Sequence, residues 1–399
     1  MIYNLISRLE EWLIDHDLWG FFRVFTFSEF RAIVAIILSF LIVVCLGKRT
    51  IHWLLKQKIG DVPEFHHQDL NRIMQHKSNT PTMGGILITG AILVCTLLLA
   101  DLRSFYVHMA LVCMGWLLML GAADDWLKLT SAQRKPGSRD GLYFWEKLVL
   151  QFGLAVVLGL FIHHYGQFKM ETDPLGFWKM SHSLTLPLVK SWTFDPAQNQ
   201  YVPSPTLIVL SAWPFVIMAM LVIAGSSNAV NLTDGLDGLA GGIMAICAFA
   251  FMVLALIAGK ENYAKVLLVP YIPLSDELAI VAGAMVGSCL GFLWFNCKPA
   301  QVFMGDAGSL PLGGLLGYIA VVVRQEVLLV IIAGVFVLES LSVMLQVGCF
   351  KLTGKRLFKC APLHHHFHMT GWTEGQTVVR FWLLTAVFVA IALATIKLR

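Results

Sequence analysis

Charged residues are scarce in this sequence, and their scarcity excludes a soluble globular fold. Asp, Glu, Lys and Arg make up 14% of the 399 residues, whereas 57% are hydrophobic, and the mean hydropathy is +0.72. A water-soluble domain of this length needs a far more polar surface. Lipid must therefore be the solvent for most of the chain. The formal net charge of only +4 gives no reason to expect nucleic acid as a partner.

The sequence also lacks the cysteine pattern of a disulfide framework or a zinc site. Its eight cysteines are scattered, mostly in apolar runs, without a CxxC pair, so we expect them to be packing residues. A basic start followed by a short apolar core and a cleavage site is missing as well, because acidic residues such as Glu10 and Asp15 precede the first long apolar run. No cleaved signal peptide is expected.

Long apolar runs are what the chain has instead. About ten runs approach the roughly 20 residues that a membrane-spanning helix requires. They are Ala32–Gly47, Met83–Ala100, Tyr106–Ala123, Tyr143–His163, Leu207–Gly225, Leu239–Gly259, Leu278–Phe295, Leu310–Val323, Val327–Gly348 and Val378–Ile396. Because unpaired backbone groups cannot face lipid, these runs should be helices. The predicted fold is an all-α integral membrane protein, a bundle of about ten transmembrane helices in which residues 1–399 form a single polytopic domain.

The basic residues predict how the bundle is oriented. Most of the 29 lysines and arginines lie in alternate loops, within residues 48–77, 128–147, 298 and 351–380. By the positive-inside rule these loops are cytosolic and both termini are external. The long loop at residues 166–205 is then external, and we expect it to be structural. Within residues 1–30, the amphipathic stretch Leu5–Phe27 is expected to lie along the membrane interface.

Acidic residues gather where three spans reach the predicted cytosolic boundary. The third span runs into Asp124 and Asp125, the fifth into residues 228–237, and the seventh into a loop with Asp306. Acids are costly in so apolar a chain and usually serve a function. Adjacent carboxylates repel, and hard oxygen ligands suit Mg²⁺ and phosphate chemistry. We expect Asp124, Asp125 and Asp306 to hold Mg²⁺; the alternative is that the Asp pair only caps a helix end.

The second acidic cluster has a regular spacing. Asn228, Asn231, Asp234 and Asp237 follow at intervals of three, so consecutive members are neighbours if the segment is helical. A polar turn ended by glycines is the alternative. In the third cluster, the small residues around Asp306 would let a ligand phosphate approach the backbone.

Basic and histidine side chains near these acids are candidate substrate contacts. Lys77, Lys128 and Lys147 could meet phosphate, although a lysine at a membrane boundary is also an ordinary headgroup contact. Three successive histidines, residues 364–366, cannot all face one ion from a regular element. We therefore expect His365 or a neighbour to contact a substrate phosphate or sugar. Glu339, which shares a helical face with Gln346, is predicted to make an interhelical hydrogen bond.

The order of these motifs resembles the polyprenyl-phosphate N-acetylhexosamine-1-phosphate transferases. The segments that carry the resemblance are Thr80–Gly85, Asp124-Asp125 with Lys128, Asn228–Leu239, Phe292–Asn296, Phe303–Ser309, His364–Trp372 and Arg380–Trp382. Together they cover nearly the whole chain. The histidine run followed by Gly371-Trp372 is similar to the muramoyl-pentapeptide branch of that superfamily.

The resemblance implies a reaction and a set of site residues. Undecaprenyl phosphate would attack the β-phosphorus of UDP-MurNAc-pentapeptide with Mg²⁺ as cofactor, giving lipid I and UMP. The enzyme would be a homodimer in the bacterial inner membrane, with a cytosolic active site. The implied catalytic residues are Asp124, Asp125, Lys128 and Asp306. The implied substrate-binding residues are Lys77, Thr82, Lys147, Asn228, Asn231, Asp234, Gly235, Leu236, Asp237, Asn296, Phe303, Gln346, His364, His365 and His366, with Phe303 able to stack on uracil.

Two other functions are compatible with parts of this pattern. Transfer of N-acetylglucosamine phosphate to the same lipid, for another envelope polymer, would use the same chemistry. An ion-coupled transporter would also have about ten spans and intramembrane acids, but it should place its polar site near mid-bilayer in broken helices and often shows internal repeats. No internal repeat is evident in this sequence.

Overall fold

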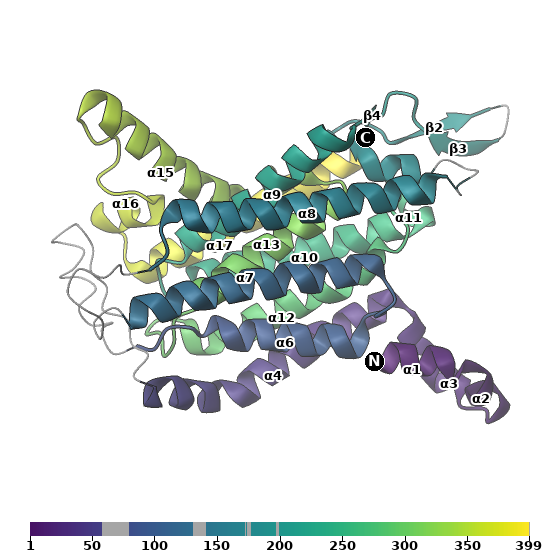
Figure 1. Ribbon diagram of the computed structural model, residues 1–399, viewed down its shortest axis with the longest axis horizontal. Helices are drawn as coiled ribbons and strands as arrows, with labels where there is room; N and C mark the ends of the chain where they lie inside the picture. Colours follow the sequence, from purple (N-terminus) through teal and green to yellow (C-terminus); the bar gives the residue numbers. More distant parts are fainter. Residues whose placement is uncertain (58–79, 131–140, 172, 174–176, 197–198, 399) are drawn as a thin grey trace.

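Long apolar helices run side by side through the described part of the chain (Figure 1). The computed structural model describes all residues except 58–79, 131–140, 172, 174–176, 197–198 and 399. Within that part, eight helices are long and apolar enough to cross a membrane. They are α4 (Ser28–Lys56), α7 (Phe105–Leu129), α8 (Phe144–Met170), α9 (Ala212–Thr233), α10 (Leu239–Gly259), α12 (Leu278–Asn296, preceded by η5, Ser275–Glu277), α15 (Gly334–Thr353) and α17 (Glu374–Lys397).

Two further apolar helices are shorter. α6 (Gly85–Leu99) and α13 (Asp306–Val322) fall on two of the ten predicted runs but do not reach the length of the other eight. The prediction of an all-α membrane protein is confirmed. The number of helices that cross the bilayer completely stays a prediction.

Short elements cover the ends of the bundle. The N-terminal segment folds into α1 (Ile2–Arg8), α2 (Glu10–Asp15), α3 (Trp19–Phe22) and η1 (Arg23–Thr26). Between α8 and α9 lie η4 (Phe177–His182), β1 (Ser183–Leu184), β2 (Trp192–Asp195), β3 (Gln200–Pro203) and β4 (Ile208–Val209). β1 pairs antiparallel with β4, and β2 with β3. The remaining short helices are α11 (Glu261–Leu267), α14 (Glu326–Ile332) and α16 (Leu363–Met369).

Two predicted spans contain a change of secondary structure that the sequence did not predict. The run expected from Leu207 begins with the strand β4, and its helix α9 starts at Ala212 and continues to Thr233. The run expected over Val327–Gly348 is divided at Ala333 into α14 and α15. Hydropathy reports only that a segment is apolar, and a short apolar stretch can be strand, helix or a break between helices.

Small residues let the central helices approach closely. Gly283, Gly287 and Gly291 of α12 recur every four residues, and an added Cβ at Gly287 would overlap the carbonyl oxygen of Ile36 in α4. Such spacing is typical of tightly packed membrane helices. Nearly every residue of α12 and all of α13 are buried, so these two helices form the core around which the others pack.

The two ends of the bundle differ. Both termini and the β2–β3 hairpin lie at one end, whereas α16 and the C-terminal part of α15 lie at the other (Figure 1). The first end is closed by a buried ion pair in which the Arg31 guanidinium lies 2.7 Å from the Glu277 carboxylate. Arg31 also donates to the Leu99 carbonyl, and Glu277 accepts from the Asp101 N–H, so this network joins α4 and η5 to the end of α6.

Candidate active site

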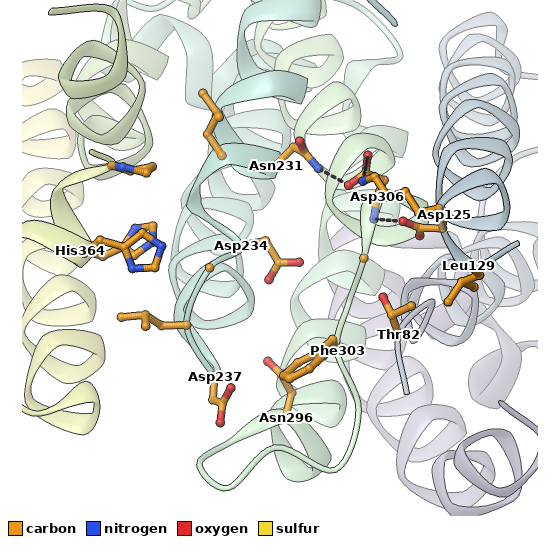
Figure 2. A pocket seen from close by; sticks show the side chains of 17 residues that line it. Thr82, Asp125, Leu129, Asn231, Asp234, Asp237, Asn296, Phe303, Asp306 and His364 are labelled. Carbon is orange, nitrogen blue, oxygen red and sulfur yellow. Dashed lines mark hydrogen bonds and ion pairs between the residues drawn. The ribbon is translucent and has the colours of Figure 1, made fainter. Parts of the chain in front are cut away.

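A pocket of about 370 Å³ is lined in part by α16 (Figure 2). It therefore lies at the end of the bundle that is opposite to the termini (Figure 1). The ends of α7, α9 and α12, the starts of α13 and α16, and the segments before α6, α10, α13 and α16 form its wall. Its described lining residues are Thr82, Asp125, Lys128, Leu129, Asn231, Leu232, Asp234, Gly235, Leu236, Asp237, Asn296, Phe303, Gly305, Asp306, Pro362, His364 and His365. The three acidic clusters therefore meet in one place, as the sequence predicts.

The start of α13 places Asp306 against the end of α7. Gly305 has a φ of +71°, a left-handed conformation that favours glycine. Gly121 of α7 has no side chain to block the approach, since an added Cβ would overlap the Asp306 carbonyl. The Asp125 carboxylate then accepts the N–H groups of Asp306 and Ala307 at 3.1 and 3.0 Å. Asp125 thus caps the start of α13 and also lines the pocket, and its part in holding Mg²⁺ stays a prediction.

The segment before α6 is tied to the segment before α13. Phe303 donates its N–H to the Pro81 carbonyl and accepts from the Gly84 N–H, both at 2.8 Å. Gly308 lies so close to Gly85 that neither could carry a Cβ without a clash. Gly308 therefore serves helix packing, and the approach of a ligand phosphate to the backbone around Asp306 stays a prediction. The same pairing holds Thr82 and Phe303 on the pocket wall.

Two lysines connect the buried carboxylates. The Lys147 Nζ lies 2.6 Å from Asp124 and 2.7 Å from Asp306, and the Lys128 Nζ lies 2.8 and 3.3 Å from the same two carboxylates. Asp124, Asp125 and Asp306 are all buried. The two ammonium groups offset part of the negative charge of the three carboxylates. The remaining negative charge would favour the binding of a further cation.

The donor set of this cluster fits a hard divalent metal. One carboxylate oxygen from each of Asp124, Asp125 and Asp306 lies within 4.8 Å of the others. Oxygen-only ligands of this kind suit Mg²⁺. Asp125 and Asp306 line the pocket, whereas Asp124 is fully buried and is not among the described lining residues.

The second acidic cluster is part helix and part turn. α9 ends at Thr233, so only Asn228 and Asn231 are helical. Asn231 donates to Asp306 at 2.7 Å. Asn228 instead donates to Gln151 of α8 at 2.6 Å and does not belong to the described lining of the pocket. The helical alternative therefore holds for Asn228 and Asn231, and the polar turn holds from Asp234 onward.

The turn after α9 carries the remaining members of that cluster. Asp234 projects into the pocket (Figure 2), where burial and the carboxylates of Asp306 and Asp125 raise its pKa to about 7. Asp237 accepts from the Ala300 N–H at 3.1 Å. Asn296 accepts from the Gly238 N–H and donates to the Val302 carbonyl. These bonds join the loop before α10 to the loop before α13, so the pocket wall is one connected unit.

The three histidines separate, as the argument from regular geometry predicts. His364 and His365 line the pocket from α16, whereas the His366 Nδ1 accepts from the Lys359 N–H at 3.2 Å. Gln346 holds the preceding loop by accepting from the N–H groups of Leu357 and Phe358. Neither His366 nor Gln346 is among the described lining residues, and Lys77 lies outside the described residues.

Four lining residues were not expected from the sequence. Gly305 and Pro362 stand next to predicted motifs, so their position beside Asp306 and the histidine run could have indicated them. Leu129 and Leu232 carry no polar signal and are found only because α7 and α9 end at the pocket.

Fold and site together define a class: a helical membrane protein with an acidic, lysine-bridged pocket where several helices end. The family model described as glycosyl transferase family 4 matches residues 107–324. The phospho-N-acetylmuramoyl-pentapeptide-transferase signature 1 matches residues 77–88.

Two curated relatives narrow the class further. A phospho-N-acetylmuramoyl-pentapeptide-transferase of Koribacter versatilis is 41% identical over 95% of each chain. A protein of the same name from Desulfotalea psychrophila is 40% identical over the whole of both chains. The chain belongs to the phospho-N-acetylmuramoyl-pentapeptide-transferase family.

Proposed function

We propose that the chain transfers phospho-MurNAc-pentapeptide from UDP-MurNAc-pentapeptide to undecaprenyl phosphate, forming lipid I and releasing UMP. The full-length similarity to two relatives named phospho-N-acetylmuramoyl-pentapeptide-transferase carries the proposal. The pocket supports it, because one substrate is held in the bilayer and the other is a charged nucleotide that cannot enter it. A site where helices end, as here, can reach both.

The pocket residues have separate parts in this reaction. Asp306, Asp125 and Asp124 would hold Mg²⁺, which would neutralise charge on the transferred phosphoryl group. Lys128 and Lys147 form ion pairs with Asp124 and Asp306 and so fix the positions of these carboxylates. The two lysines would also offer positive charge to the diphosphate. The Phe303 ring lines the pocket and would stack on uracil. Asn231 would orient Asp306, and Asp234 and Thr82, which also line the pocket, would make polar contacts with the substrate.

The two other functions fit less well. A transporter should have its polar site near mid-bilayer, whereas this pocket lies where several helices end. Transfer of N-acetylglucosamine phosphate would use the same acids, and the names of the relatives favour the muramoyl-pentapeptide substrate. Supplying each nucleotide sugar to the purified protein separates these two reactions.

We expect UMP release to require three components together. Purified protein should release UMP from UDP-MurNAc-pentapeptide only when undecaprenyl phosphate and Mg²⁺ are both present, and EDTA should stop the reaction until Mg²⁺ is restored in excess. UMP release without the lipid would indicate a hydrolase. Full activity in EDTA would remove the metal from the proposal.

We also propose that the pocket faces the cytosol of a bacterial inner membrane, with residues 1–30 and 166–205 on the periplasmic side of one polytopic domain. Single cysteines at Asn199, in the β2–β3 turn, and at Lys355, after α15, test this in a background without the eight native cysteines. A membrane-impermeant maleimide should label Asn199→Cys in intact cells and Lys355→Cys only after permeabilisation. Equal labelling of both from outside would contradict the orientation.

A homodimer is the assembly that the family resemblance implies. Apolar side chains of α17 such as Leu383 and Val387 are more than half exposed, so they face lipid or a second subunit. Mass measurement of the protein in detergent would distinguish one copy from two.

A further inference from the structure

We propose that Glu339 is a positioning residue for substrate binding. Its carboxylate holds His364 with Nε2 directed into the pocket, and that nitrogen accepts a hydrogen bond from an N–H or O–H group of the nucleotide sugar. The inference rests on the proposed function and deepens it. It assigns a role in substrate binding to a buried carboxylate that does not itself line the pocket.

The geometry around Glu339 determines which ring nitrogen of His364 carries the proton. Glu339 of α15 is fully buried and accepts the His364 backbone N–H at 3.1 Å. A second oxygen of the same carboxylate lies 3.1 Å from the His364 Nδ1. An ionised carboxylate can only accept, so Nδ1 must be the donor. In the neutral imidazole, Nε2 then has a free lone pair and is the acceptor.

The His364 Nε2 has no hydrogen-bond partner among the described residues. The side chain is only 1% exposed, yet it lines the pocket. Buried polar atoms are nearly always hydrogen-bonded, and one without a partner at the wall of a pocket indicates a ligand atom. Burial alone would favour an apolar side chain at this position. The unpaired Nε2 of His364 therefore indicates that this atom binds a ligand.

Gly235 lies directly against this nitrogen, and any side chain at position 235 would block the approach to it. An added Cβ at position 235 would overlap the His364 Nε2. His364 and Asp306 lie on opposite sides of Asp234 in the pocket (Figure 2), so the group that His364 binds is remote from the phosphates near Asp306. A contact of this kind acts equally on the bound substrate and on the transition state, and its loss raises KM more than it lowers kcat.

The test is the Glu339→Gln variant, whose amide can donate to Nδ1 and so permits the wrong tautomer. We expect the KM for UDP-MurNAc-pentapeptide to rise about tenfold, as the loss of one good hydrogen bond would give. The kcat and the KM for undecaprenyl phosphate should change by less than about threefold. Glu339→Asp keeps the carboxylate and should retain part of the affinity. Glu277→Gln, which removes a buried carboxylate at the other end of the bundle, should leave both KM values unchanged.

A second readout does not depend on activity. In protein with ¹⁵N-labelled histidine, the signal lost in His364→Gln should report an Nδ1–H tautomer in the wild type and a shifted population in Glu339→Gln. A double-mutant cycle should show that His364→Gln adds little to Glu339→Gln. If the wild type transfers substrate but Glu339→Gln changes neither the tautomer nor the KM, the inference is overturned. If the wild type shows no transfer, the proposed function fails, and the tautomer still tests whether Glu339 positions His364.

Discussion

Asp306→Asn is expected to lower the rate of UMP release by on the order of 10³-fold while the bundle stays folded. Asp306 is the carboxylate on which the site converges, since Lys147, Lys128 and Asn231 all contact it. An amide is a poorer ligand for a hard cation. A neutral amide also cannot form ion pairs with two ammonium groups. Lys128 and Lys147 would therefore no longer be held in position to contact the diphosphate.

The rate should be measured at limiting and at saturating Mg²⁺, with thermal unfolding in detergent to establish that the variant is folded. Asp276→Asn is a matched control, because this half-buried acid lies next to Gly259 at the other end of α10. Near-normal turnover of Asp306→Asn at limiting Mg²⁺ would remove Asp306 from the metal site.

Asp124→Asn is expected to lose about 10²-fold or more in rate at every pH, which would make Asp124 an organiser of the site and not a general base. Asp124 is fully buried. One of its oxygens is within 2.8 Å of both Lys128 and Lys147, and the other accepts from the Leu142 N–H at 2.7 Å. A carboxylate enclosed in this way orients the two lysines. It is not among the described lining residues of the pocket, so it does not contact a lipid phosphate bound there.

A general base would behave differently in the same variant. The second pKa of a phosphate monoester is near 6, so rising pH would deprotonate the lipid phosphate without help and restore part of the activity. The rate of the variant relative to wild type should be followed from about pH 6 to 9 with Mg²⁺ saturating. A ratio that is low and flat supports the organising role. A ratio that rises about tenfold per pH unit below the substrate pKa would establish Asp124 as the base.

Hydropathy and the positions of acids were enough to predict the membrane class, the apolar helices and the convergence of three acidic clusters. Each of these properties is local, because a helix in lipid satisfies its own backbone and an acid is tolerated only where it has a partner or water. Asp125 and Asp306 were identifiable from the sequence for that reason, and both line the pocket. The family resemblance added Phe303 and Asn296, which also line it.

Tertiary structure decided which side chains share a partner. Asn228 and Asn231 are one helical turn apart, yet one faces Gln151 and the other Asp306. Lys147 contacts Asp306 although 159 positions in the sequence separate them. Glu339 of α15 contacts His364 of α16. Such contacts depend on how helices rotate and cross, which is set by close packing at residues such as Gly121 and not by the local sequence around the polar residues themselves.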